Sequence, residues 1–211
     1  MNEHHMIPAR ITEIMISKIC HDLVSPVGAV NNGIEFLSDV GAEGLSDGLG
    51  LMEHSARQAS VRLQLFRMCY GAGGSDAKVT GKMIYETFQN YIAGTKTQLE
   101  WDLMNDMPDQ DLPAGFMKTV LNMFVFAHES LPKGGVVQVA YNDNAMTVKA
   151  QGDLVRPKDG SFDALTNDVD AVDIDPKSVH GYITRAYAAQ YGFNLSASLS
   201  DSGVFLSINI P

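Results

Sequence analysis

A histidine and an aspartate stand side by side at His21 and Asp22, followed closely by Ser25. A neutral imidazole has one unprotonated nitrogen that can attack phosphorus, and a carboxylate near the other nitrogen can hold its proton and stabilise the charge that develops. Ser25 lies one helical turn beyond His21, where its hydroxyl group could position water or a phosphoryl oxygen. Taken alone, a histidine on a helix surface is most often a solvated side chain. The combination of residue types nevertheless predicts phosphoryl chemistry on His21.

The segment around His21, "KICHDLVSPVGAVNNGIEFL", has the apolar spacing of a helix that packs against other helices. Its apolar residues repeat at intervals of four and three, which is typical of a coiled coil or helical bundle. They are Ile16, Cys20, Leu23, Val27, Val30, Ile34 and Leu37. Pro26 has no N–H group, so the carbonyl group of Asp22 loses its helical partner and the helix should bend there. A bend beside His21 would open space for a docking partner.

A second stretch carries the same kind of apolar seam and predicts a second helix. Its members are Leu49, Met52, Ala56, Ala59, Leu63, Phe66 and Tyr70. The short, glycine-rich segment "DVGAEGLSDG" between the two stretches suits a connection between antiparallel helices. Because two helices alone cannot enclose a core, we expect two copies of this hairpin to form a four-helix bundle in a homodimer.

The rest of the chain predicts a second domain of mixed helices and strands. Helices are expected at Gly81–Tyr91, Pro113–Leu131 and Ser178–Tyr191, and strands in "TQLEWDL", "VVQVAYN", "AMTVKA", "NLSASLS" and "GVFLSINIP". The last four strands should pair as two hairpins. The predicted fold class is therefore α+β, with a helical hairpin at residues 1–74 and an α/β sandwich at residues 75–211, whose helices lie on one face of a mixed sheet.

The composition argues against several classes of protein. The chain has 211 residues, a formal charge of −10 and a pI of about 4.9. An acidic chain without a basic run is a poor binder of nucleic acid. No segment reaches the roughly 18 consecutive apolar residues that span a bilayer. The first ten residues, "MNEHHMIPAR", lack the apolar core of a signal peptide, so a cytoplasmic location is expected.

Two cysteines and two arginines of the hairpin are expected to have structural or solvated roles. Cys20 and Cys69 lie in or near the apolar seams, so we expect buried thiols and not a disulfide framework or a metal site. Arg62 and Arg67 lie off the seam of the second helix and are expected at the surface. A less favoured alternative is that they meet a receiver domain or a phosphoryl group.

Three further histidines and an acidic segment are not expected to bind metal. His54, His128 and His180 have no second ligand nearby in the sequence. The segment Phe162–Pro176, "FDALTNDVDAVDIDP", lacks the glycine and the glutamate of a calcium loop at the required positions. We expect this segment to be a solvated loop.

The residues around His21 resemble the phosphoacceptor helix of histidine kinases. The core pattern of that helix is His-acid-x-x-(Thr/Asn/Ser)-Pro, and His21, Asp22, Ser25 and Pro26 match it position by position. The further run "GAVNNGIEFL" is similar to histidine phosphotransferases of the ChpT type, which act in alphaproteobacterial cell-cycle signalling. The resemblance extends over nearly the whole chain and implies that the sandwich is similar to the ATP-binding domain of the kinases.

The resemblance implies a histidine phosphotransferase of a bacterial phosphorelay. His21 would accept a phosphoryl group from the receiver-domain aspartate of a hybrid histidine kinase similar to CckA. It would pass the group to response regulators similar to CtrA and CpdR, with Asp22 and Ser25 as the other residues of the site. Magnesium belongs to the acidic pocket of the partner receiver domain, so the protein is expected to need no cofactor or metal of its own.

The kinase motifs that bind ATP are degraded in the second domain. The segment "VLNMFVFAHESLPKGG" aligns with the kinase pattern LNLLxNAxxALPxGG and places Phe126 at the metal-binding asparagine. In "TVKAQGDLV", Ala150 and Leu154 replace the aspartate and the last glycine of Asp-x-Gly-x-Gly, although Gly152 matches. The glycine-rich turn before the last helix keeps only Gly181. Because a triphosphate needs a metal ligand and close backbone approach, no ATP binding is expected.

Two other functions stay open at the level of the sequence. One is an ATP-dependent histidine kinase core without its sensor, against which the lost motifs count. The other is a non-catalytic adaptor that sequesters a response regulator through the same bundle. A labelled phosphoryl group on His21 would separate the adaptor from a phosphotransferase.

Overall fold

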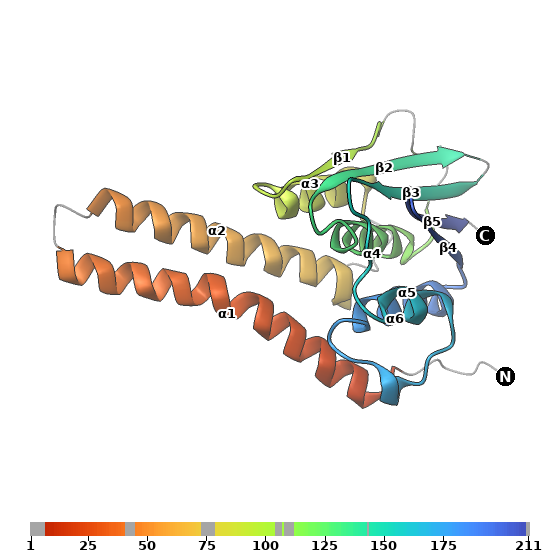
Figure 1. Cartoon of the computed structure of the whole chain (residues 1–211), viewed down its shortest axis with the longest axis horizontal. Helices are drawn as coiled ribbons and strands as arrows, with labels where there is room; N and C mark the ends of the chain where they lie inside the picture. The colour runs from red at the N-terminus through yellow and green to blue at the C-terminus, as the bar shows by residue number, and fades with distance from the viewer. Residues whose placement is uncertain are drawn as a thin grey trace.

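A long helical hairpin projects from an α/β sandwich (Figure 1). The computed structural model of the protein describes residues 7–40, 45–72, 79–103, 107, 112–142 and 144–209. The hairpin consists of α1 (Ala9–Val40) and α2 (Leu45–Tyr70), which pack along each other in opposite directions. The predicted helical hairpin is thus confirmed.

A glycine and a proline shape the hairpin. Pro26 lies inside α1, and the helix changes direction near its middle, as expected where a helical hydrogen bond is missing (Figure 1). Gly33 of α1 lies directly against α2, because a Cβ atom added there would stand only 2.4 Å from Cγ of Met52. The absence of a side chain at this position lets the two helices approach closely.

The sandwich combines a five-stranded sheet with three longer helices. Its helices are α3 (Gly81–Ile92), α4 (Phe116–Glu129) and α6 (Val179–Gln190), and its strands are β1 (Thr97–Glu100), β2 (Gly135–Asn142), β3 (Ala145–Gln151), β4 (Asn194–Ser200) and β5 (Gly203–Asn209). The strand order is β1-β2-β3-β5-β4. Only the β1–β2 pair is parallel, so the sheet is mixed. The predicted α+β fold class is confirmed, with element ends shifted by a few residues.

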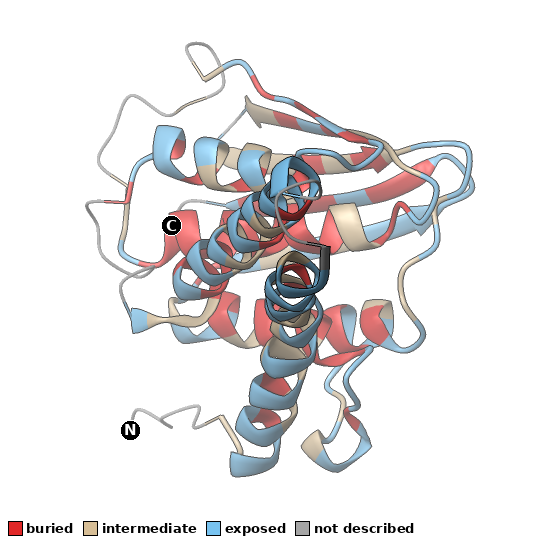
Figure 2. Ribbon diagram, turned by 90° about the vertical axis from the view of Figure 1, so that its left-hand side faces the viewer, coloured by how far each residue is buried: buried red, intermediate tan, exposed pale blue. Residues whose placement is uncertain are grey.

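The core of the sandwich lies between the sheet and α4. Every residue of α4 from Phe116 to Ala127 is buried. In the sheet, the paired residues Val139, Val148 and Leu206 are buried, whereas their strand neighbours face the other side. Figure 2 shows buried residues concentrated in the sandwich and exposed residues along the outer sides of the hairpin.

The base of the hairpin shares apolar cores with the sandwich. Near the start of α1, Ile11 and Met15 pack in one cluster with Ile183 of α6. Near the end of α2, Leu65 and Cys69 join the main core of the sandwich. This packing holds the first half of α1 beside the sandwich.

Two expectations from the sequence are wrong. The segment Phe162–Pro176 is not simply a solvated loop, because it contains most of α5 (Ser161–Thr166), a 3-10 helix (Ala171–Asp173) and buried apolar residues, including Leu165. The aspartates of this segment obscured the apolar residues between them. Cys20 is exposed, since its part of the α1 seam faces outward from the hairpin, whereas Cys69 is buried as expected.

Candidate functional site

His21 is exposed on the first half of α1, with 89% of its side chain accessible to solvent. Its Nδ1 atom lies 3.3 Å from Oδ1 of Asp22. A carboxylate can only accept hydrogen bonds, so in the neutral ring this contact assigns the proton to Nδ1 and leaves the lone pair of Nε2 free. Ser25 is exposed one turn further along α1, and within the described ranges no hydrogen bond joins it to His21. The geometry therefore places the imidazole of His21 at the surface, with its Nδ1 side towards the carboxylate of Asp22.

Arg62 of α2 pairs with the backbone carbonyl group that Pro26 leaves without a helical hydrogen bond in α1. The carbonyl oxygen of Asp22 has no N–H group to accept from at position 26, and the guanidinium group of Arg62 donates a hydrogen bond to it instead. Arg62 is thus half-buried and not simply a surface residue, whereas Arg67 is exposed as expected. The signal in the sequence was the unpaired carbonyl group itself, which required a donor from the facing helix.

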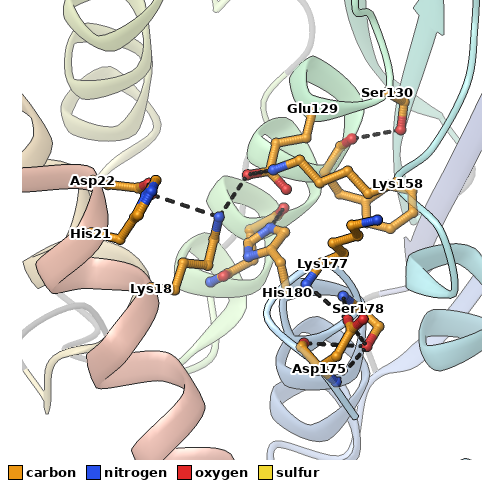
Figure 3. Close-up of polar contacts among 12 residues, drawn as sticks. Lys18, His21, Asp22, Glu129, Ser130, Lys158, Asp175, Lys177, Ser178 and His180 are labelled. Atoms are coloured by element: carbon orange, nitrogen blue, oxygen red, sulfur yellow. Dashed lines mark hydrogen bonds and ion pairs between the residues drawn. The ribbon is translucent and has the colours of Figure 1, made fainter. Parts of the chain in front are cut away.

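A row of alternating charges leads from His21 into the sandwich (Figure 3). Oδ2 of Asp22 lies 3.6 Å from Nζ of Lys18, one turn earlier on α1. The same ammonium group lies 3.2 Å from Oε1 of Glu129 at the end of α4. Nζ of Lys158, after β3, lies 2.7 Å from that oxygen. Sequence reasoning missed Lys18, Glu129 and Lys158, because more than a hundred residues separate Lys18 from the other two.

The charges of this row stabilise one another. Burial opposes the ionisation of Glu129, but the charges of His180, Lys18 and Lys158 outweigh burial and lower the pKa of Glu129 to about 2. Burial lowers the pKa of His180 itself, so its ring is neutral at pH 7. At that pH the charged partners of Glu129 are therefore Lys18 and Lys158. Burial also opposes the charge of Lys18, yet Glu129 and Asp22 raise its pKa. Glu129 and Lys18 are therefore both ionised at neutral pH.

The Glu129→Gln substitution should destabilise the protein at pH 7 but not at pH 2. Because the pKa of Glu129 is lower in the folded protein than in the unfolded chain, its contribution to stability is complete above about pH 5 and is lost as the pH falls towards 2. The shift corresponds to at most about 3 kcal/mol. Urea unfolding at pH 7, 4.5 and 2.5 should show that the difference in free energy of unfolding between wild type and Glu129→Gln shrinks as the pH falls.

A matched control for this experiment is Glu53→Gln. Glu53 also forms an ion pair, with Arg57 at 3.5 Å, but both side chains are exposed on α2. Exposed pairs add little to stability, so this variant should have the same free energy of unfolding as the wild type at every pH. If the difference in free energy of unfolding between wild type and Glu129→Gln stays constant from pH 7 to pH 2.5, the low pKa of Glu129 is contradicted.

The row of charges borders a basic cleft of about 1190 Å³ between the hairpin and the sandwich. Asp22, the neighbour of His21, lies on its wall. The basic residues on its walls are Lys18, Arg62, Lys96, Lys133, Arg156, Lys158 and Lys177. These seven basic residues face four acidic ones, although the whole chain is strongly acidic. The cleft therefore carries a local positive charge beside the phosphoacceptor candidate.

The positions of the degraded kinase motifs do not form a polar site. Phe126 is 2% exposed and packs in the main core, and Ala150 is completely buried. His180 is buried in the hydrogen-bonded interior, with Nδ1 3.0 Å from the hydroxyl oxygen of Tyr70 and Nε2 3.0 Å from the carbonyl oxygen of Asn122. These contacts explain His180 as a structural residue.

His128 and His54 are the other histidines among the described residues. His128 lies 2.9 Å from the hydroxyl oxygen of Thr97, and His54 is exposed on α2. In the part of the chain that the structure describes, no cluster of three or more His, Cys, Asp or Glu side chains is arranged to hold a metal ion. None of the described helices is both long and apolar enough to cross a membrane.

Residues 82–203, more than half of the chain, match the family model of the histidine phosphotransferase C-terminal domain. The chain therefore belongs to the histidine phosphotransferase family. The protein phosphotransferase ChpT of Brucella abortus (strain 2308) is 29% identical to it over 199 residues, 92% of either chain. The predicted resemblance to ChpT-type proteins is thus confirmed.

The fold is likewise similar to that of a solved phosphotransferase. The 1.7 Å structure of a bacterial phosphotransferase superposes with a TM-score of 0.78 at 27% identity, over 97% of this chain and 98% of that one. A histidine kinase domain from the blue-light-activated kinase of Erythrobacter litoralis, named EL346, gives a TM-score of 0.42 at 15% identity, over 97% and 94% of the two chains.

Proposed function

We propose that the protein transfers phosphoryl groups in a bacterial phosphorelay through a phosphohistidine at His21. The observation that carries the proposal is the exposed imidazole of His21, whose Nδ1 is held by Asp22. The donor would be the receiver-domain aspartate of a hybrid histidine kinase, and the acceptors would be response regulators. Membership of the histidine phosphotransferase family supports this role. By the sequence resemblance, the partners would be similar to CckA, CtrA and CpdR.

The chemical step requires only groups that His21 and its partner supply. The lone pair of Nε2 forms the N–P bond while the P–O bond to the receiver aspartate breaks, and the bonding pair leaves with the aspartate carboxylate. The proton on Nδ1 stays in place, and the negative charge of Asp22 stabilises the positive charge that develops on the ring. Magnesium would be held by the receiver, and Ser25 would stand near the transferred group. Reversal of the same step would pass the group to the next receiver.

The Asp22→Asn substitution should slow phosphotransfer by about a hundredfold. The amide has nearly the same shape as the carboxylate but removes the charge that stabilises the developing imidazolium. Single-turnover transfer from a phosphorylated receiver domain, followed by rapid quenching, gives the rate. The exposed Asp39 on the same helix provides the control, since Asp39→Asn should transfer at the wild-type rate. An unchanged rate in Asp22→Asn would remove Asp22 from the chemistry.

Two surfaces beside His21 are suited to a receiver domain. Val24 is three residues further along α1 and strongly exposed, which supplies an apolar contact. The basic cleft lies on the sandwich side of Asp22 and complements the acidic pocket of a receiver domain. We infer that the receiver contacts the hairpin first and that the sandwich offers this second, charged surface.

The exposed part of the hairpin seams supports a homodimer. Within one chain, the pairing of α1 and α2 covers only part of the two seams. Large apolar residues of the seams stay exposed, namely Ile16, Val27, Ile34, Leu49 and Leu63. A second copy of the hairpin would cover them in a four-helix bundle, which is the arrangement we propose.

We expect no saturable binding of Mg-ATP by the full chain. Phe126 places an aromatic ring in the apolar core at the position where a kinase has its metal-binding asparagine. Ala150 provides no carboxylate for the adenine amino group. Isothermal titration calorimetry with Mg-ATP up to millimolar concentration should therefore give only heats of dilution. A saturable heat at micromolar ligand would contradict this expectation and favour the kinase alternative.

The proposed function is tested by comparing two phosphoryl sources. Incubation with labelled ATP alone should leave the protein unlabelled, whereas incubation with a phosphorylated receiver domain should label it rapidly. Label from ATP alone would identify a kinase. Tight binding of the receiver without any label would identify the adaptor.

A further inference from the structure

Glu129 is a carboxylate where local structure does not favour one. It is the last residue of α4, where the partial negative charge of the helix C-terminus opposes a further negative charge. Its side chain is only 14% exposed, so burial adds a second cost. Neither helix formation nor core packing therefore stabilises the charge of Glu129. The stabilisation must come from the residues that its carboxylate contacts.

One of the two partners of Glu129 is sufficient to neutralise it. Lys158, which belongs to the sandwich, makes the shorter contact at 2.7 Å. Lys18 comes from the hairpin and makes a second contact at 3.2 Å with the same oxygen. Since Lys158 already supplies a full counter-charge, the main effect of the second contact is on Lys18. It holds a long, flexible side chain in place beside Asp22.

We propose that Lys18 and Glu129 are positioning residues of phosphotransfer, an inference that rests on the proposed function of His21. Glu129 holds the ammonium group of Lys18, and Lys18 holds Oδ2 of Asp22. The other oxygen, Oδ1, is then left facing Nδ1 of His21 (Figure 3). The sandwich thereby contributes one residue to the arrangement of the phosphoacceptor.

The consequence concerns the tautomer of His21. A free imidazole exchanges its proton between the two nitrogens, and only the form with the proton on Nδ1 has a nucleophilic lone pair on Nε2. A carboxylate of Asp22 that is fixed at Oδ2 keeps that proton on Nδ1. Without Lys18, the carboxylate can turn away, and part of the population has the proton on Nε2, where it blocks attack.

The test uses the full chain with two independent readouts. Lys18→Met keeps most of the aliphatic side chain but loses the charge, and Glu129→Gln loses the charge at nearly the same volume. Each should lower the maximal rate of transfer from a phosphorylated receiver domain about tenfold, with the half-saturating receiver concentration unchanged. The ring ¹⁵N signals of His21 at pH 8 should shift towards the form with the proton on Nε2. Lys18→Arg should restore both readouts.

A matched control and a double variant complete the test. Lys133→Met removes an exposed lysine from the same cleft and should change receiver affinity alone, leaving the ring signals as in the wild type. Because Lys18 and Glu129 act in series, the double variant should lose no more rate than Lys18→Met. Unchanged ring signals in Lys18→Met, or a loss confined to receiver affinity, would overturn the inference. If the wild type accepts no phosphoryl group, the proposed function fails, but the ring signals still decide on the positioning role.

Discussion

The His21→Ala substitution should abolish uptake of a phosphoryl group from a phosphorylated receiver domain, down to the detection limit of the label. The variant removes the only atom that forms the N–P bond in the proposed step, so the loss should exceed the effect of any neighbouring substitution. The fold should be unaffected, because His21 is almost fully exposed and, among the described residues, its side chain forms a hydrogen bond or ion pair only with Asp22. Gel autoradiography after seconds of mixing measures the uptake.

His54→Ala provides the control for this result. His54 is also an exposed histidine of the hairpin, on α2, but its ring contacts Gln58, and the neighbouring Glu53 pairs with Arg57 instead. This variant should take up the label at the wild-type rate. Full uptake by His21→Ala together with loss in His54→Ala would move the phosphoacceptor to α2.

The Leu63→Asp substitution should convert the protein into a monomer. Leu63 is 53% exposed in the single chain, so the folded subunit tolerates a charge there. In the proposed bundle, the same position is covered by the partner, and a buried unpaired charge costs several kcal/mol. That cost weakens association by a factor of about a thousand. Multi-angle light scattering at micromolar concentration should give the mass of one chain, 22.9 kDa, in place of twice that mass.

The exposed residue Met83 on α3 offers a matched control for the dimer. It is an exposed apolar residue like Leu63, but it lies in the sandwich, outside the proposed bundle. Met83→Asp should therefore stay dimeric. A wild-type protein that is monomeric at these concentrations would contradict the proposed bundle, as would a dimeric Leu63→Asp variant.

Local patterns were sufficient to predict most of the fold. The spacing of the apolar residues in α1 and α2 predicted the hairpin, and the strand hairpins followed from alternation and short turns. The His21–Asp22 contact could be predicted as well, because the two residues are neighbours in the sequence. The exposure of Cys20 could not, because the spacing of a seam does not show which of its positions the facing helix covers.

The remainder of the site depends on contacts between distant parts of the chain. Lys18 and Glu129 are 111 residues apart in sequence, and Glu129 falls at a variable position of the kinase pattern. Their meeting depends on how the base of the hairpin packs into the sandwich, through residues such as Ile11 and Cys69. Arg62 is an intermediate case, because the proline in α1 predicted an unpaired carbonyl group but not the residue that would pair with it.

The most direct test of the account is to locate the phosphoryl group after transfer. The full chain is mixed with a phosphorylated receiver domain, quenched at alkaline pH to preserve phosphohistidine, and examined by ³¹P NMR and by tandem mass spectrometry under conditions that keep the N–P bond. We predict one phosphoryl group per chain, bonded to Nε2 of His21. A phosphoryl group on another residue, or bonded to Nδ1 of His21, would contradict the account.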